Sequence, residues 1–376
     1  MKSTPQINIL FCVRKQFFTK KGGDSYQILL LKKLLEKNNF SITLSINLKK
    51  IKVQNFHLIH FFNLSRIDDT YQVFKNAQKY NIKTCLTPIF QNLTNYNKKG
   101  RFSIFSNIIK HLSYNQLEKI RLFIHLFSFQ ISFNLFFKIL FKSYQQLGKD
   151  FLNQSNLIFC NSHQEKKEIE KFFNVKLKNK VEFIKPAIDT TEISLNDKSF
   201  LNQYPHQKYL LIVGRIEDLK NQVTILEALE KLNFEIVFIG KFNKNHQRYT
   251  NRFKKLIQQN PKAFHYPNLT RKLVLSAIQN AEVILQVSCF ENFGLVSLEA
   301  HLFNKKLLIS KESFFNHSLH TNYPEANPYS KKDIHEKVLL SINDKNEIQT
   351  VGFSEYIKHE DSFISNTINA YLKILS

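Results

Sequence analysis

The sequence predicts an α/β protein with two domains in series, each built on a parallel sheet covered by helices. The chain has 376 residues, of which 43% are hydrophobic, and this size fits two domains of roughly 150–200 residues each. Short apolar runs that are typical of buried strands alternate with stretches of helical spacing, a pattern that favours parallel sheets. The alternation restarts after Pro205, so we expect the join between the domains near residues 186–206.

The first half of the sequence contains the strands and helices expected for the first of these sheets. Two helices are expected, over Tyr26–Lys37 and Asp69–Tyr80, and the first has Ile28 and Leu31 on one face. The expected strands are Ile7–Val13, Ser41–Ile46, Leu58–Phe62, Lys83–Ile89, Leu157–Cys160 and Val181–Ile184. Asp68 and Asp69 form an acid pair, and we interpret them as the N-cap of the second helix rather than as metal ligands.

The second half repeats the pattern. Its expected strands are Tyr209–Val213, Glu235–Ile239, Ala281–Val287 and Lys306–Ser310. Its expected helices are Gln222–Leu232, Tyr249–Gln258, Leu273–Gln279, Phe293–Phe303 and Phe353–Leu375. We therefore place an N-terminal domain at 1–190, a C-terminal domain at 191–352 and a final helix at 353–376.

The charge balance favours anionic partners. Lys and Arg total 54 against 30 Asp and Glu, a formal net charge of +24. About half of this excess is attributable to the Lys-, Asn-, Ile- and Phe-rich composition. No arginine-rich arm or nucleic-acid motif concentrates the charge, so no nucleic-acid partner is expected.

The cysteines and the N-terminus indicate a reducing, cytosol-facing location. Cys12, Cys85, Cys160 and Cys289 are isolated and lie in apolar contexts, which predicts buried free thiols. The first apolar run is short and lacks a small-residue cleavage pattern, so it reads as a strand rather than a signal peptide.

An apolar, basic insert occupies about 101–147. Its core, Leu122–Phe141, is long enough to raise the question of a membrane span, but His125, Gln130 and Lys138 interrupt it. Three interpretations stay open. The segment is an interfacial helix on an anionic membrane, a helix pair packed on the N-terminal sheet or facing the cleft, or a true span.

The strongest chemical signal is the stretch from Phe290 to Ala300. A strand ends at Val287 and a helix is expected to start near Phe293, so its first amides lack intrahelical partners and suit a phosphate. Gly294 permits close approach of a ligand, and the carboxylates of Glu291 and Glu299 can accept hydrogen bonds from sugar hydroxyls. The alternative is an ordinary helix start capped by Asn292, with Glu299 solvated.

A second signal follows the strand at 209–213. Gly214 and Arg215 end that strand, and Lys220 comes five residues later, where we expect it to open the next helix. Cations at the carboxyl end of a parallel strand lie where open α/β sheets bind ligands, and an Arg–Lys pair suits a diphosphate. The alternative is a surface cation pair beside a turn.

These motifs resemble those of the family 4 glycosyltransferases (glycosyl transferases group 1), which have the two-domain GT-B architecture. Gly214, Arg215 and Lys220 resemble the family's "vGRl…KN" motif, and Glu291–Ala300 resembles its "E-x-FGL-xx-lEA" signature. Weaker matches are the loop Gly22-Gly23-Asp24, the "NS-xxE" stretch Asn161–Glu165 and the segment Ile184–Asp189. The last helix resembles the one that returns to the first domain in this family.

The resemblance implies two Rossmann-like domains that face a cleft, and retaining transfer from a nucleoside-diphosphate sugar without a cofactor or a metal. Glu299 would bind the ribose and Glu291 the sugar, while Arg215 and Lys220 would hold the diphosphate. The other implied donor-binding residues are Gly22, Gly23, Gly214, Phe293, Gly294, Leu295 and Val296. The resemblance supplies no acceptor-side histidine, because Thr87–Phe90 occupies the expected strand end.

We therefore expect a glycosyltransferase that acts on a glycan or lipid-linked acceptor in surface polysaccharide biosynthesis, in the cytoplasm or on the inner face of the plasma membrane. Three alternatives remain: a GT-B sugar-nucleotide epimerase, a sucrose-type synthase, and a basic binding protein without catalysis.

Overall fold

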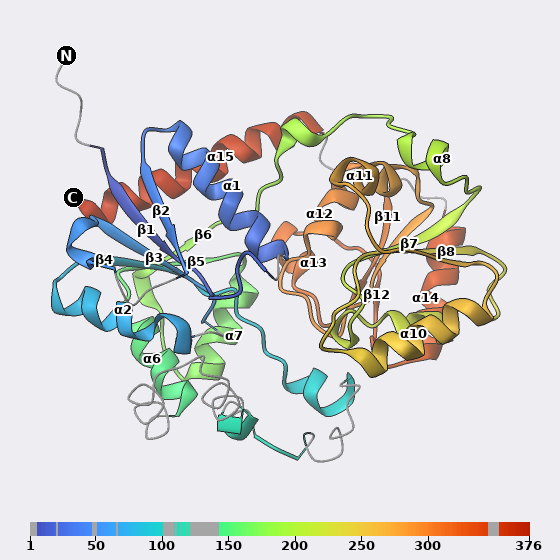
Figure 1. Ribbon diagram of the computed structural model, residues 1–376, viewed down its shortest axis with the longest axis horizontal. Helices are drawn as coiled ribbons and strands as arrows, with labels where there is room; N and C mark the ends of the chain where they lie inside the picture. The colour runs from blue at the N-terminus through green and yellow to red at the C-terminus, as the bar shows by residue number, and fades with distance from the viewer. Residues whose placement is uncertain are drawn as a thin grey trace. The chain divides into compact units, whose positions relative to one another are not determined.

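The computed structural model contains two compact units (Figure 1). It describes residues 6–19, 22–46, 51–64, 67–100, 109, 111–113, 115–117, 119–120, 143–344 and 353–376. Unit 1 comprises Met1–Asn92, Leu112–Ala187 and His359–Ser376, and unit 2 comprises Leu93–His111 and Ile188–Lys358. The chain thus passes from unit 1 into unit 2 between Ala187 and Ile188, and the end of the chain returns to unit 1.

Unit 1 is built on a six-stranded sheet in the order β2-β1-β3-β4-β5-β6, and all its strand pairs are parallel. The strands are β1 (Asn8–Cys12), β2 (Ser41–Ser45), β3 (Leu58–Phe62), β4 (Lys83–Thr87), β5 (Leu157–Cys160) and β6 (Val181–Phe183). Every residue of β3 and β5 is buried, as expected for central strands with helices on both faces.

Helices cover both faces of this sheet (Figure 1). One face carries α1 (Gly23–Lys37) and α15 (Phe353–Leu375), and the other carries α2 (Ile67–Lys79), α6 (Tyr144–Gln154) and α7 (His163–Phe173). Short turns complete the unit at η2 (Val53–Asn55) and η5 (Lys178–Lys180). The fully buried Tyr371 of α15 bonds to Nδ1 of His60 on β3 at 2.6 Å, which fixes the last helix to the sheet.

Unit 2 repeats the design with the strand order β12-β11-β10-β7-β8-β9, again with parallel pairs. Its strands are β7 (Tyr209–Val213), β8 (Glu235–Ile239), β9 (Ala263–Tyr266), β10 (Val283–Gln286), β11 (Lys306–Ser310) and β12 (Glu325–Ala326). Its helices are α8 (Ser199–Gln203), α9 (Gln222–Ala228), α10 (Gln247–Gln259), α11 (Arg271–Asn280), α12 (Leu295–Leu302), α13 (Phe315–Leu319) and α14 (Lys331–Asn343), with turns at η4 (Tyr96–Gly100), η6 (Thr190–Glu192) and η7 (Asp218–Lys220).

The predicted fold class of two Rossmann-like parallel sheets is confirmed, with local corrections. Strand β4 ends at Thr87 instead of Ile89, because Pro88 has no amide hydrogen for the ladder. Helix α2 begins at Ile67, so Asp68 and Asp69 lie in its first turn and not at its N-cap. Helix α12 begins at Leu295, two residues later than predicted.

All four cysteines are free and buried, as predicted. Most of the apolar insert at 101–147 lies outside the described residues, so its three interpretations stay predictions. Among the described residues, no helix is both long and apolar enough to cross a membrane.

Candidate functional site

The two predicted motifs meet at the carboxyl ends of the strands of the unit 2 sheet. Strands β7 and β10 are parallel neighbours, so the loops that follow them leave the sheet side by side. The β7 loop carries Gly214 to Lys220, and the β10 loop carries Val287 to Gly294. A backbone hydrogen bond from Cys289 N to Leu219 O, 2.8 Å long, fastens the loops together.

The ammonium of Lys220 and the carboxylate of Glu291 form an ion pair across these loops. Both side chains are about four-fifths buried, at 23% and 19% exposed. The stem of Lys220 lies over Gly214, where an added Cβ would be 3.6 Å from Lys220 Cδ. An added Cβ at Gly294 would lie 3.1 Å from Glu291 Cγ. The structure therefore brings Gly214, Lys220, Glu291 and Gly294 into one cluster.

Lys220 is placed by a 3-10 turn rather than by the start of a helix, which corrects the predicted position. It is the last residue of η7, and Asn221 follows with φ 64° before α9 begins at Gln222. The Asn221 amide donates to Val287 O at 3.1 Å and to Pro328 O at 2.7 Å. The left-handed residue thus ties the lysine loop to the β10 loop.

Arg215 lies at the rim of this cluster. Its side chain is 46% exposed, and Nη2 contacts Glu217 Oε1 at 3.1 Å. The other Glu217 oxygen accepts from Asn243 Nδ2 at 2.5 Å, and Gln222 Nε2 donates to Arg215 O at 2.8 Å. The backbone of Arg215 and its partner Glu217 are therefore held by hydrogen bonds, while the Arg215 guanidinium stays in contact with solvent.

The N-terminus of α12 is open toward the same cluster. Its N-cap is Gly294 at φ 82°, with no side-chain cap, so Asn292 is not the cap that the alternative interpretation required. The amides of Leu295 and Val296 belong to the first turn, which lacks intrahelical partners. Phe293 precedes the helix and packs on Phe315, with ring centroids 5.6 Å apart. It lies in the core beneath the amides.

Ser297 is a residue that the sequence reasoning missed. Its side chain is in the first turn of α12 and the residue is 1% exposed. Its Oγ lies 3.1 Å from where a Cβ on Gly294 would be, and no described residue gives it a hydrogen bond. A buried hydroxyl without a partner beside open helix amides can donate a hydrogen bond to an anionic ligand.

Glu299 is buried, not solvated, which contradicts the other half of that alternative. The residue is 2% exposed, and its Oε1 accepts from Arg271 Nη2 at 2.6 Å. Its Oε2 has no partner among the described residues. Burial raises the pKa of this carboxyl group, while Arg271 opposes the rise. Neither the burial nor the arginine partner was evident in the sequence.

The loop that carries Glu291 is fixed from two further sides. Glu291 N donates to Glu312 O, and Phe314 N donates to Glu291 O, each at 3.2 Å. The Glu312 carboxylate accepts from Asn95 Nδ2 at 3.1 Å. Asn95 directly precedes η4, so a segment from before residue 101 takes part in the structure of unit 2.

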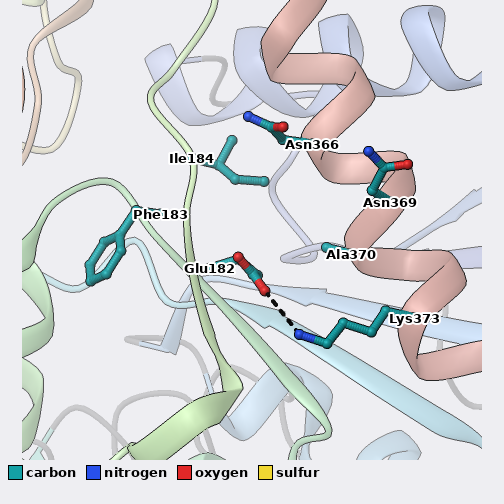
Figure 2. A pocket seen from close by; sticks show the side chains of 7 residues that line it. All are labelled: Glu182, Phe183, Ile184, Asn366, Asn369, Ala370 and Lys373. Atoms are coloured by element: carbon teal, nitrogen blue, oxygen red, sulfur yellow. Dashed lines mark ion pairs between the residues drawn. The ribbon is translucent and has the colours of Figure 1, made fainter.

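The predicted Gly22 and Gly23 lie in unit 1, where Gly22 is the N-cap of α1. The adjacent Asp24 receives Arg14 Nε at 2.9 Å, which holds the loop after β1. In the same unit, a cavity of about 300 Å³ lies between β6 and α15 (Figure 2). The ion pair of Glu182 and Lys373, 3.8 Å long, lies at its edge, and none of the predicted site residues lines it.

Comparisons with known proteins identify unit 2. Residues 194–360 match the family model of the glycosyl transferases group 1. This part of the chain is a glycosyl transferases group 1 domain, and the chain is a glycosyltransferase. It therefore transfers a sugar from a nucleotide sugar, and the family that the motifs resemble is confirmed. No curated protein sequence matches the chain.

Solved glycosyltransferase structures share the fold along nearly the whole chain. The sucrose-phosphate synthase of Thermosynechococcus elongatus is similar with a TM-score of 0.74 and 11% identity, covering 98% of this chain and 99% of that one. HepE of Anabaena, solved with UDP and glucose, has a TM-score of 0.66 and 14% identity, and the match covers 98% of this chain and 100% of that one. WaaG, a glycosyltransferase of lipopolysaccharide biosynthesis, has a TM-score of 0.59 and 11% identity, and the match covers 97% of this chain and 99% of that one. At these identities the likeness shows the GT-B fold.

Proposed function

We propose that this glycosyltransferase is a retaining enzyme whose donor, a nucleoside-diphosphate sugar, binds at the Lys220–Glu291 cluster. Arg215, Lys220 and the first amides of α12 would hold the diphosphate, Glu299 the ribose and Glu291 the transferred sugar. The observation that carries this assignment is the ion pair of Lys220 and Glu291 beside the open N-terminus of α12.

The chemistry requires stabilisation of the charge that develops on the leaving diphosphate. A cation about 4 Å away contributes roughly 4 kcal/mol at an effective dielectric constant near 20. Lys220 can deliver this charge from a mostly buried position, and Arg215 can turn toward the ligand from the rim. The dipole of α12 adds partial positive charge at its N-terminus.

The ion pair also defines an exchange on donor binding. In the structure, Glu291 neutralises Lys220. A diphosphate that takes over the ammonium releases the carboxylate to accept hydrogen bonds from the sugar hydroxyls. In this proposal, Lys220 and Glu291 neutralise each other in the ion pair, whereas in the donor complex Lys220 binds the diphosphate and Glu291 binds the sugar.

The proposed donor base is uracil and the proposed acceptor is a glycan or lipid-linked glycan in surface polysaccharide biosynthesis. The Anabaena relative solved with UDP and glucose supports the first choice, and the lipopolysaccharide enzyme supports the second. The likeness to a sucrose-phosphate synthase favours a soluble sugar acceptor as the second candidate.

A thermal-shift panel of UDP-, GDP- and ADP-sugars tests the donor. We expect one nucleotide series to raise the melting temperature and the product to keep the anomeric configuration of the donor, as read by NMR. A panel without any shift would contradict the donor site, and inverted product would contradict retention. Free sugar nucleotides that change configuration would indicate the epimerase alternative instead.

Acceptor assays then separate the two acceptor classes. Transfer to a lipid-linked glycan but not to a soluble sugar supports the first class, and the reverse supports the second. Flotation with anionic vesicles at low salt tests membrane contact, and a protein that stays at the bottom of the gradient would contradict it.

A further inference from the structure

Arg271 occupies a position between two carboxylates of unequal burial. It is the first residue of α11, directly after the N-cap Thr270. Its Nη2 lies 2.6 Å from Glu299 Oε1, and its Nε lies 3.6 Å from Glu192 Oε2. All three residues belong to unit 2. One guanidinium is therefore shared between α12 and the turn η6.

The two carboxylates differ sharply in their environment. The Glu299 side chain is 2% exposed, whereas the Glu192 side chain is 44% exposed. Only one oxygen of Glu299 is engaged by Arg271, and the other, Oε2, is a buried acceptor without a partner among the described residues. A buried, unpartnered acceptor beside a phosphate-type site indicates a ligand hydroxyl as its missing donor.

We propose that Arg271 is a positioning residue that holds Glu299 with Oε2 directed to the ribose hydroxyls of the donor, and that Glu192 weakens this hold. The inference rests on the proposed function, since it needs a nucleoside diphosphate in the site. It adds a residue that neither motif contains.

The physical basis is the charge of Glu299. Two hydroxyl donors bind best to a carboxylate, because a protonated carboxyl group spends one oxygen as a donor. Burial favours the protonated form and raises the pKa, Arg271 favours the carboxylate, and Glu192 favours the protonated form again. Among the described residues, Arg271 and Glu192 are the charged groups that act on Glu299.

Glu192 lies close to the point where the chain passes from unit 1 into unit 2. It ends η6, five residues after Ala187, the last residue of unit 1 before the crossing. The residue that competes for Arg271 thus lies on the segment by which the chain enters unit 2. Arg271 thus contacts both Glu299, the carboxylate proposed to bind the ribose, and Glu192, which lies on the crossing segment.

The test measures UDP and inorganic pyrophosphate binding by calorimetry between about pH 5 and pH 8 in the full chain. R271Q is expected to weaken UDP about tenfold, as for loss of a charged hydrogen bond, while pyrophosphate changes less than about twofold. R271K should restore part of the UDP affinity. The pH below which UDP affinity falls should move up in R271Q and down in E192Q.

A matched control is available in the same unit. Arg252 Nη2 pairs with Glu227 Oε1 at 2.7 Å, between α10 and α9, so R252Q removes a similar pair away from the motifs. R252Q should leave both affinities and the pH profile unchanged. If R271Q weakens UDP and pyrophosphate equally, or keeps the wild-type pH profile, the inference is overturned. If wild-type protein binds pyrophosphate but not UDP, GDP or ADP, the proposed function fails instead.

Discussion

Lys220 and Glu291 form an ion pair although they are 71 residues apart in the chain. The pair exists because β7 and β10 are parallel neighbours whose loops emerge together. Each residue is also fixed by its backbone, Lys220 by the turn η7 and Glu291 by hydrogen bonds to the 312–314 loop. Held in this way, the carboxylate and the ammonium neutralise each other.

Replacing Glu291 with glutamine separates its two functions. E291Q removes the carboxylate that competes for Lys220, so affinity for UDP should stay the same or increase. Turnover should fall on the order of 10²–10³-fold, because an electrostatic partner of the reacting sugar is lost. Calorimetry and steady-state kinetics measure the two effects. A parallel loss of UDP affinity would contradict the exchange at Lys220.

Replacing Lys220 with alanine should affect both binding and rate. K220A removes the mostly buried cation of the cluster, so kcat/KM for the donor should fall on the order of 10²–10³-fold. The control is K331A, since Lys331 pairs with Glu227 at 2.6 Å but is 58% exposed. Exposed pairs contribute about 0–1 kcal/mol, so K331A should behave like wild type. Equal effects of both changes would argue against a specific role of Lys220.

The strands were the most predictable part of the fold. The bounds of β3, β7, β8 and β11 agree with prediction residue for residue, because each is a short, mostly apolar run with polar or glycine residues next to it. Helices α7 and α14 were missed although Ser162 and Ser330 cap them, each accepting from the amide three residues on.

The sequence places Arg215, Lys220 and Glu291 in segments that follow strands, but it does not show that β7 and β10 are neighbours. The contact of Lys220 with Glu291 follows from that adjacency, and only the family resemblance of the two motifs assigned them to one site. The contact of Arg271 with Glu299 depends on how α11 lies against α12, which no local pattern encodes. The burial of Glu299 likewise follows from three-dimensional packing, so the sequence left a solvated Glu299 open as an alternative.

Gly240 packs closely against the backbone of the loop that carries Gly214. A Cβ added there would lie 2.1 Å from Gly214 O, a contact that backbone atoms must move to relieve. G240A should therefore lower stability by about 1–3 kcal/mol, the usual cost of overpacking, and weaken UDP binding because the Gly214 loop shifts. Urea unfolding and calorimetry measure both. Wild-type UDP affinity in a destabilised G240A would show that the loop position is not critical.

His60 makes the stability of unit 1 depend on pH. Burial lowers its pKa from the ordinary 6.5 to about 3, and the ring bonds to the Tyr371 hydroxyl and, at 2.7 Å, to Thr87 Oγ1. Below pH 6.5 the unfolded chain binds a proton that the native state does not. The contribution of His60 is therefore present above pH 6.5 and is lost as the pH falls toward 3.

The expected loss between pH 7 and pH 5 is roughly 2 kcal/mol, at about 1.36 kcal/mol per pH unit below 6.5. Urea unfolding of wild type and H60Q at both pH values isolates it, because the other titrating groups are common to the two proteins. The control Y371F keeps the burial that causes the shift, so it should lose about 1 kcal/mol at every pH and retain the slope. An H60Q protein with the wild-type slope would show that another group carries the dependence.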